Sequence, residues 1–174
     1  MAVRDILQLG NSGLRVRCTP VKASGNESVR RLVDDLRDTL HDFRARNGFG
    51  RGIAAPQIGS TTRVIFVEID SPVELINPVI VKKSRKMMTL WDDCFSFPTL
   101  LAKVRRHLSV DVRYRDLQGK RHTLHAEGPL SELLQHEIDH IDGILAIDRA
   151  IDSRHIVYRT EYERQSGRPS QLVL

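Results

Sequence analysis

The sequence lacks the features that mark membrane-spanning, secreted or disulfide-stabilised proteins. No apolar run approaches the roughly 20 residues needed to cross a bilayer. Cys18 and Cys94 are the only cysteines, too few for a disulfide framework, and we expect Cys18 to be a small buried residue. Residues 1–10 lack the basic-then-apolar pattern of a signal peptide, so we expect a cytoplasmic protein.

Aromatic residues are also scarce, at 5% of the chain. This scarcity argues against a surface that stacks nucleic-acid bases, and we expect no sequence-specific binding of nucleic acid. The net charge is +5, but the positive residues are spread along the chain without a long block of like charge. Such an excess would suit contact with an acidic partner such as the ribosome surface.

What the sequence does contain is typical of one globular domain. Its 174 residues are 40% apolar and 28% charged, and no repeat is visible, so we expect a monomer with a single core. Apolar spacing predicts a helix over 28–46 and a second helix over 129–142. The remaining predictions are a glycine-rich loop over 48–59, strands over 64–68, 75–81, 108–114 and 121–125, and a further helix within 144–162.

These patterns predict the α+β class, with antiparallel or mixed sheets packed around the second helix. We expect a catalytic domain over 1–165 and a loose C-terminal tail over 166–174.

The strongest chemical signal is the stretch from Gln135 to His140, Gln-His-Glu-Ile-Asp-His. On a helix, His136 and His140 lie one turn apart on one face, so two imidazoles can bind one metal ion. Glu137 projects beside them, where its carboxylate can exchange protons with a water on the metal. This arrangement indicates a metal-dependent hydrolase acting on amide-like bonds.

The site needs a third protein ligand, and the sequence offers candidates on both sides of the motif. Cys94 lies upstream, and a thiolate with two imidazoles leaves an open fourth position for water. A zinc protease would instead use a carboxylate or histidine downstream. The downstream candidates are Asp148, Asp152, His155 and Glu161.

Three separated stretches resemble the signature segments of the peptide deformylases. Gly50 to Gln57 is similar to the family's Gly-x-Gly-x-Ala-Ala-Pro-Gln loop, and Asp92 to Ser96 is similar to its Glu-Gly-Cys-Leu-Ser segment. Gln135 to His140 is similar to its Gln-His-Glu-x-Asp-His helix. The order and approximate gaps agree, and three ordered motifs are far more specific than the histidine motif alone.

The resemblance implies removal of the formyl group from N-formylmethionyl nascent chains, a step of N-terminal methionine processing in protein biosynthesis. It implies one divalent metal held by Cys94, His136 and His140. We expect iron(II) in the cell, and zinc, nickel or cobalt can occupy such a site in the purified protein. Hydroxide formed on the metal would attack the formyl carbon, with Glu137 as general base and then general acid.

The resemblance also assigns supporting roles around the substrate. The side-chain amide of Gln57 and the backbone N–H of Phe95 would stabilise the oxyanion. Gly52 and Ile53 are expected to contact the substrate. Arg51 stands at a position that is usually apolar in the family, near the methionine side chain.

We also expect charged residues near the three metal ligands to influence the site. Asp92, paired with Arg106, and Asp139 are expected to support the ligating histidines or to form structural ion pairs. Asp93 replaces the family's glycine, so we expect its carboxylate to raise the pKa of the metal-bound water. It would also strain the backbone if φ there were positive.

Two other functions remain open at this point. One is a diverged relative with weak activity or another N-acyl substrate, which the departures from the family pattern suggest. The other is a non-catalytic, metal-stabilised module associated with the ribosome, which the basic charge suggests.

Overall fold

The computed structural model describes residues 2–167, and its fold is α+β, as predicted. The strands are β1 (Gly52–Ala54), β2 (Val64–Glu68), β3 (Pro72–Lys83), β4 (Met87–Asp93), β5 (Leu100–His107), β6 (Ser109–Arg115), β7 (Arg121–Glu127) and β8 (Ile156–Tyr158). The helices are α1 (Glu27–Asn47), α2 (Pro129–Ile141) and α3 (Arg159–Ser166), with 3-10 helices at Ser12–Arg15, Ala55–Ile58, Ala146–Arg149 and Ser153–His155.

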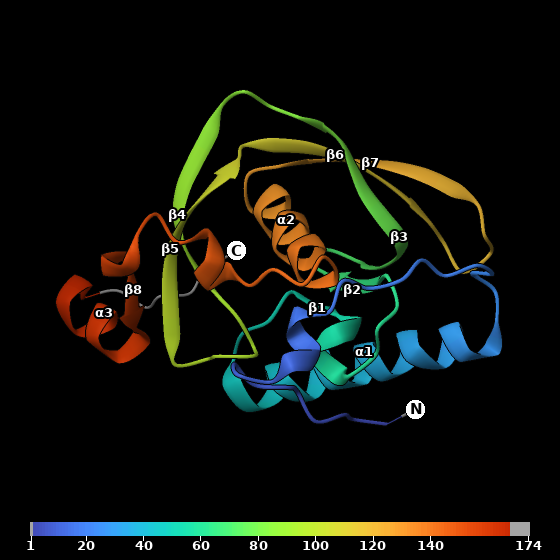
Figure 1. The fold of residues 1–174 in the computed structure, drawn as a ribbon, viewed down its shortest axis with the longest axis horizontal. Coiled ribbons are helices and arrows are strands. Elements are labelled where there is room, and N and C mark those ends of the chain that lie inside the picture. The colour runs from blue at the N-terminus through green and yellow to red at the C-terminus, as the bar shows by residue number, and fades with distance from the viewer. Residues whose placement is uncertain (1, 168–174) are drawn as a thin grey trace.

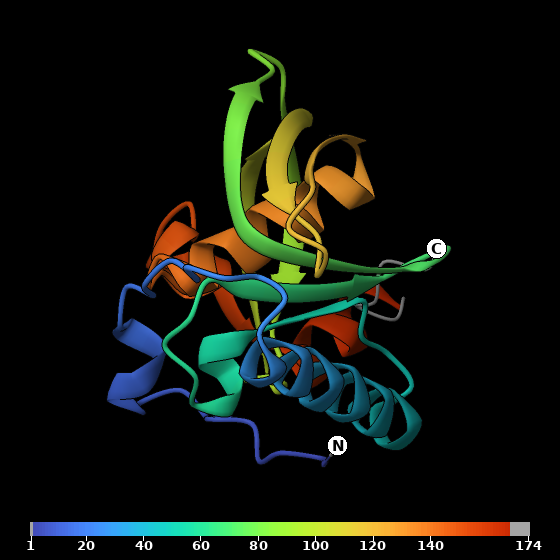
Figure 2. The same ribbon diagram turned by 90° about the vertical axis from the view of Figure 1, so that its right-hand side faces the viewer.

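The strands form two antiparallel sheets, in the orders β1-β2-β3-β6-β7 and β4-β5-β8. Helix α2 lies between the two sheets (Figure 1), and α1 lies on the opposite side of the larger sheet (Figure 2).

Strand β2 shows how the larger sheet packs against both helices. Val64 and Phe66 join the hydrophobic cluster on the α1 side, whereas Ile65 and Val67 join the cluster on the α2 side. Because successive side chains of a strand point to opposite faces, a strand covered on both faces is apolar throughout. This is why all four residues are buried.

Helix α1 covers one face of this sheet and matches the prediction closely. Its buried residues Val33, Leu36, Leu40 and Phe43 recur at helical spacing, and Gly48 ends the helix with φ 76°. Leu36 and Leu40 are fully buried. Replacing either by alanine would cost about 2–5 kcal/mol of stability.

Helix α2 is the buried centre of the molecule. It begins at Pro129, directly after Gly128, and its residues 131–141 are all buried. A polar group in such a place must find a partner, because burial without one is costly. The buried polar residues of α2 are therefore candidates for functional residues.

Two of the predicted elements are wrong in part. The segment 144–162 is not one helix but two 3-10 helices, strand β8 and the start of α3. The predicted loop over 48–59 contains β1 and a 3-10 helix. Of the predicted tail, Ser166 belongs to α3, and residues 168–174 lie outside the described part of the chain. Across residues 2–167, no helix is long and apolar enough to cross a membrane.

Candidate active site and metal centre

Three soft or borderline donor atoms converge at the C-terminal half of α2. His136 and His140 come from the helix, and Cys94 follows the last residue of β4. The Cys94 Sγ lies 3.2 Å from His140 Nε2, which lies 3.1 Å from His136 Nε2. All three residues are buried, and their donor atoms lie within 4.8 Å of one another.

This donor set fits a divalent transition metal. An ion with bonds of about 2.0–2.3 Å to nitrogen and sulfur would hold tetrahedral donors about 3.3–3.6 Å apart, close to the distances found. Burial, and then the neighbouring His136, lower the pKa of His140 well below its usual value, so this imidazole is neutral, as a ligand must be. A thiolate and two imidazoles suit iron, nickel, cobalt or zinc.

Asp92 orients the first histidine. Its Oδ1 accepts a hydrogen bond from His136 Nδ1 at 2.8 Å, which leaves Nε2 free to bind a metal. Its Oδ2 accepts a hydrogen bond from Arg106 Nη2 at 2.9 Å. Burial raises the pKa of Asp92, but His136 and Arg106 lower it by more, so the carboxylate stays ionised.

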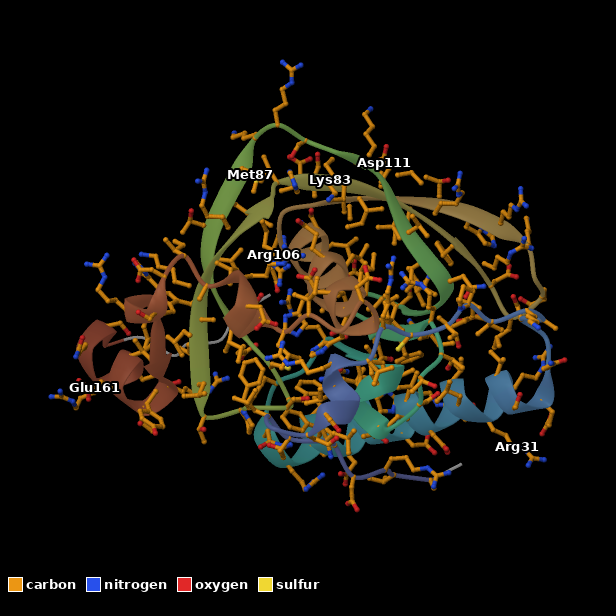
Figure 3. The ribbon with its side chains drawn as sticks, viewed as in Figure 1. Arg31, Lys83, Met87, Arg106, Asp111 and Glu161 are labelled. Atoms are coloured by element: carbon orange, nitrogen blue, oxygen red, sulfur yellow. The ribbon has the colours of Figure 1, made fainter. Side chains whose placement is uncertain are left out.

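Arg106 belongs to β5, and its side chain, labelled in Figure 3, contacts two buried carboxylates. Besides Asp92, it pairs with Asp139. Asp139 is also held by Arg149, at 2.8 Å, and it bonds neither histidine in the described structure. Asp139 is thus a structural ion-pair partner, one of the two roles expected for it.

Glu137 is buried beside the donor group. Burial raises the pKa of its carboxyl to about 7, with a further rise from Glu132 and Asp92 that His136 opposes. Its Oε2 has no hydrogen-bond partner among residues 2–167. A carboxylate with such a pKa and a free oxygen can both accept and return a proton near neutral pH.

Gln57 and Phe95 lie next to the same group. The Gln57 Oε1 accepts a hydrogen bond from the Ala54 N–H at 2.8 Å, which turns Nε2 toward Cys94 Sγ, 3.7 Å away. The backbone N–H of Phe95 donates to no other described residue. Both donors are thus placed at the wall of the site.

Gln57, Phe95 and Glu137 line one cavity of about 350 Å³. Gly52 also lines this cavity and lies close to Glu137. A Cβ on Gly52 would lie 2.9 Å from Glu137 Oε1. Glycine therefore lets the backbone of β1 approach the carboxylate. The cavity is lined by Gln57, Cys94, His136 and Glu137 together with Phe49, Arg51, Trp91, Glu132 and Leu133, among others.

Of two expected substrate contacts, Arg51 lines the cavity and Ile53 does not. Arg51 lines the cavity and forms a 2.6 Å ion pair with Glu132. Ile53 does not line the cavity, because its side chain is fully buried in the cluster around α1. Only its backbone could meet a ligand. Glu132 also lines the cavity, and its spacing of four residues before His136 is the sequence signal that places it on the same helix face.

Asp93 has a partner that the sequence did not indicate. Its Oδ2 lies 2.7 Å from Arg159 Nη2, and the Arg159 guanidinium stacks 4.7 Å from the centre of the Phe49 ring. This cation offsets the charge expected to weaken the metal site. The expected strain is also absent, since Asn77 is the only non-glycine residue with positive φ in the described structure.

The downstream candidates for the third ligand lie elsewhere, so the zinc-protease interpretation is wrong. Asp148 pairs with Arg15, Asp152 with Arg154, and Glu161 with Arg164. The histidine pair has Cys94 as its third donor, and no downstream residue joins a metal-binding group within residues 2–167.

Comparison with known proteins agrees with this geometry. The family model described as polypeptide deformylase matches residues 3–155. A peptide deformylase of Desulfitobacterium hafniense is 39% identical over 153 residues, covering 86% of this chain and 96% of that protein. One from Parafrankia sp. is 44% identical over 152 residues, covering 86% and 79%.

The similarity extends to three dimensions. A crystal structure of a peptide deformylase from Legionella pneumophila aligns with a TM-score of 0.80 at 33% identity, covering 96% of this chain and 99% of that one. The matched region contains all three donor residues, Glu137 and Gln57. The chain therefore belongs to the polypeptide deformylase family.

Proposed function

We propose that this protein hydrolyses the N-formyl group of N-formylmethionyl peptides and releases formate. The observation that carries the proposal is the convergence of Cys94, His136 and His140, together with a buried Glu137 that lines the same cavity as Cys94 and His136. Water adds to the formyl carbon, the carbon–nitrogen bond breaks, and the products are formate and a free amine.

The residues divide the chemistry among them. Cys94, His136 and His140 would hold a divalent metal, which supplies Lewis acidity and makes water a stronger acid. Glu137 takes a proton from the attacking water and returns it to the leaving amine. The Gln57 side chain and the Phe95 N–H donate hydrogen bonds to the oxygen that gains negative charge.

The proposal includes the identity of the metal, the location of the protein and its oligomeric state. Iron(II) is the proposed cellular metal, because a mixed sulfur and nitrogen donor set suits it, as it also suits zinc, nickel and cobalt. A cytoplasmic monomer that meets nascent chains at the ribosome is consistent with the net charge of +5.

The test is formate release from formyl-Met-Ala-Ser by metal-loaded protein purified without oxygen. Glu137→Gln should lower kcat by about 10²–10⁴-fold, because it removes the general base. It should leave the metal content unchanged, because the three donors remain. The matched control is Glu127→Gln, an exposed site on β7 that should keep the full rate.

A folded, metal-loaded wild type without formate release would refute the proposal. If Glu137→Gln kept its rate, the assigned role of Glu137 would be wrong. The non-catalytic alternative predicts that Glu137→Gln leaves every measured activity unchanged while ribosome binding persists.

A further inference from the structure

A buried ion pair shares the cavity with the reacting groups. Arg51 Nη2 lies 2.6 Å from Glu132 Oε2, and the two side chains are 16% and 4% exposed. Arg51 directly precedes Gly52, and Glu132 lies one turn before His136 on the same face of α2. Residues so spaced have Cβ atoms about 5–6 Å apart, so the pair lies close to the metal donors.

The first side chain of a formyl peptide must enter the same cavity. It branches from the carbon bonded to the scissile nitrogen, so it starts next to Glu137 when the formyl group is in place. This step rests on the proposed function. A volume of about 350 Å³ is enough for the formyl group and one side chain. The wall that such a side chain meets includes Phe49, Arg51, Trp91, Glu132 and Leu133.

The Arg51 guanidinium can still donate hydrogen bonds to a ligand. Of its five N–H groups, one donates to Glu132 and one to the Pro129 carbonyl, at 3.3 Å, among the described residues. A purely apolar side chain in contact with the guanidinium would displace water from the other N–H donors without accepting a hydrogen bond from them. A side chain with a neutral hydrogen-bond acceptor would instead accept the hydrogen bonds that the displaced water had accepted. An anionic side chain would be repelled by the nearby carboxylates of Glu132 and Glu137.

We propose that Arg51 and Glu132 form a polar subsite that favours formylated chains whose first residue is methionine sulfoxide. The sulfoxide oxygen is a neutral hydrogen-bond acceptor on a side chain that keeps the length of methionine. Arg51 donates to it, and Glu132 fixes the guanidinium and balances its charge. The enzyme would thereby release formate from chains whose first methionine has been oxidised.

The experiment compares formyl-X-Ala-Ser peptides in which X is methionine sulfoxide, methionine or norleucine, an apolar analogue with a methylene in place of sulfur. The wild type should have a higher kcat/KM for the sulfoxide than for norleucine. The double variant Arg51→Ile/Glu132→Ile removes both charges, so it leaves no isolated buried ion. Its sulfoxide-to-norleucine ratio should be about tenfold lower than that of the wild type.

A binding measurement separates recognition from turnover. Isothermal titration calorimetry with the product peptides, methionine sulfoxide-Ala-Ser and norleucine-Ala-Ser, should show the same change in the ratio of Kd values. The matched control is Glu27→Ala/Arg31→Ala, which removes an exposed ion pair of α1 whose Arg31 points away from the molecule (Figure 3). It should leave both ratios unchanged.

The outcomes distinguish the two proposals. Formate release with the same ratio in wild type and double variant would overturn the subsite alone, and so would a wild type that prefers norleucine. A folded protein inactive on every peptide would refute the proposed function and the subsite with it. If the double variant does not fold, Arg51→Lys replaces it, because lysine keeps the charge but loses the planar fork of donors. The ratio should then fall as well.

Discussion

Arg106 shows how a single buried residue can hold the site together. It contacts Asp92, which orients His136, and Asp139, which directly precedes His140 in the same helix. Only 4% of its side chain is exposed. Both carboxylates would lose their shared cation if the guanidinium were removed.

We therefore predict that Arg106→Met lowers the free energy of unfolding by about 3–5 kcal/mol, the usual cost of breaking a buried ion pair by removing one partner. Urea unfolding followed by circular dichroism measures the change. Arg113→Met, at an exposed position of β6, is the control and should cost less than about 0.5 kcal/mol. An equal loss in both variants would show that the buried contacts add nothing.

Gly52 is a second residue at which a single substitution should affect catalysis. A Cβ there would lie 2.9 Å from Glu137 Oε1 and 3.1 Å from Leu133 Cδ1, so one of them must move. We expect Gly52→Ala to lower kcat by about 10²-fold, because small displacements of a catalytic group have such effects.

Steady-state formate release measures this loss. The control is Gly25→Ala, whose Cβ would lie 3.3 Å from the Leu117 carbonyl; Gly25 does not line the cavity, so this variant should keep the wild-type rate. A wild-type kcat in Gly52→Ala would mean that Glu137 has room that the structure does not show.

The residues that sequence could predict are those fixed by local spacing. His136, Glu137 and His140 follow from helical geometry alone, and Cys94 could be chosen only with the help of the family motifs. The ion pairs of Glu132 with Arg51 and of Arg159 with Asp93 could not be foreseen, because the two partners of each pair are distant in the chain. An ion pair of this kind is a property of the packing.

A helix or strand can be predicted from sequence when its buried face produces a regular pattern of apolar residues. Helix α1 and strand β2 were predicted well, because each presents a regular apolar pattern. Strand β5 was not predicted, since it carries Lys103, Arg105 and Arg106, whose charges obscure its alternation. The helix expected within 144–162 is wrong for most of that segment, because two 3-10 helices and strand β8 precede α3 and leave no continuous apolar helix face.

The N-terminal segment is attached to α1 through Asp35. The Asp35 carboxylate accepts hydrogen bonds from Ala2 N at 2.9 Å and from Arg4 Nη2 at 2.7 Å. Burial raises the pKa of Asp35, but these hydrogen bonds lower it by more, so the net shift is downward. A lowered pKa means that the ionised form stabilises the fold above pH about 4, the usual unfolded value. This stabilisation is lost as the pH falls through the folded pKa.

We therefore predict that Asp35→Asn lowers the free energy of unfolding by on the order of 1 kcal/mol at pH 7. The difference from wild type should shrink as the pH falls below about 4. Denaturant unfolding across this range checks the sign. Asp70→Asn, at an exposed position after β2, should match the wild type at pH 7. A gap between Asp35→Asn and wild type that widens in acid would contradict the assignment.

At the scale of the whole molecule, the metal donors join parts that are distant in the chain. Cys94 directly follows strand β4 of the smaller sheet, whereas His136 and His140 belong to the central helix. A cation bound by all three would therefore connect the smaller sheet to α2 in the folded state only.

Removal of the metal should accordingly lower the melting temperature. At a metal concentration about 100 times Kd, binding adds about 2.7 kcal/mol. For a chain of this size that corresponds to roughly 5–10 °C. Scanning calorimetry with and without a chelator measures the shift, and Cys94→Ala should show a much smaller one. An identical shift in Cys94→Ala would exclude the thiolate as a ligand.

The contact between Arg159 and Asp93 has a consequence for the order in which the site is completed during translation. Translation proceeds from the N-terminal to the C-terminal side, so Cys94, His136 and His140 all leave the peptidyl-transferase centre before Arg159 does. Until Arg159 arrives, the Asp93 carboxylate next to the cysteine lacks this counter-ion. An ion captured by the unfinished polypeptide would thus experience a more negative environment than one captured by the released protein.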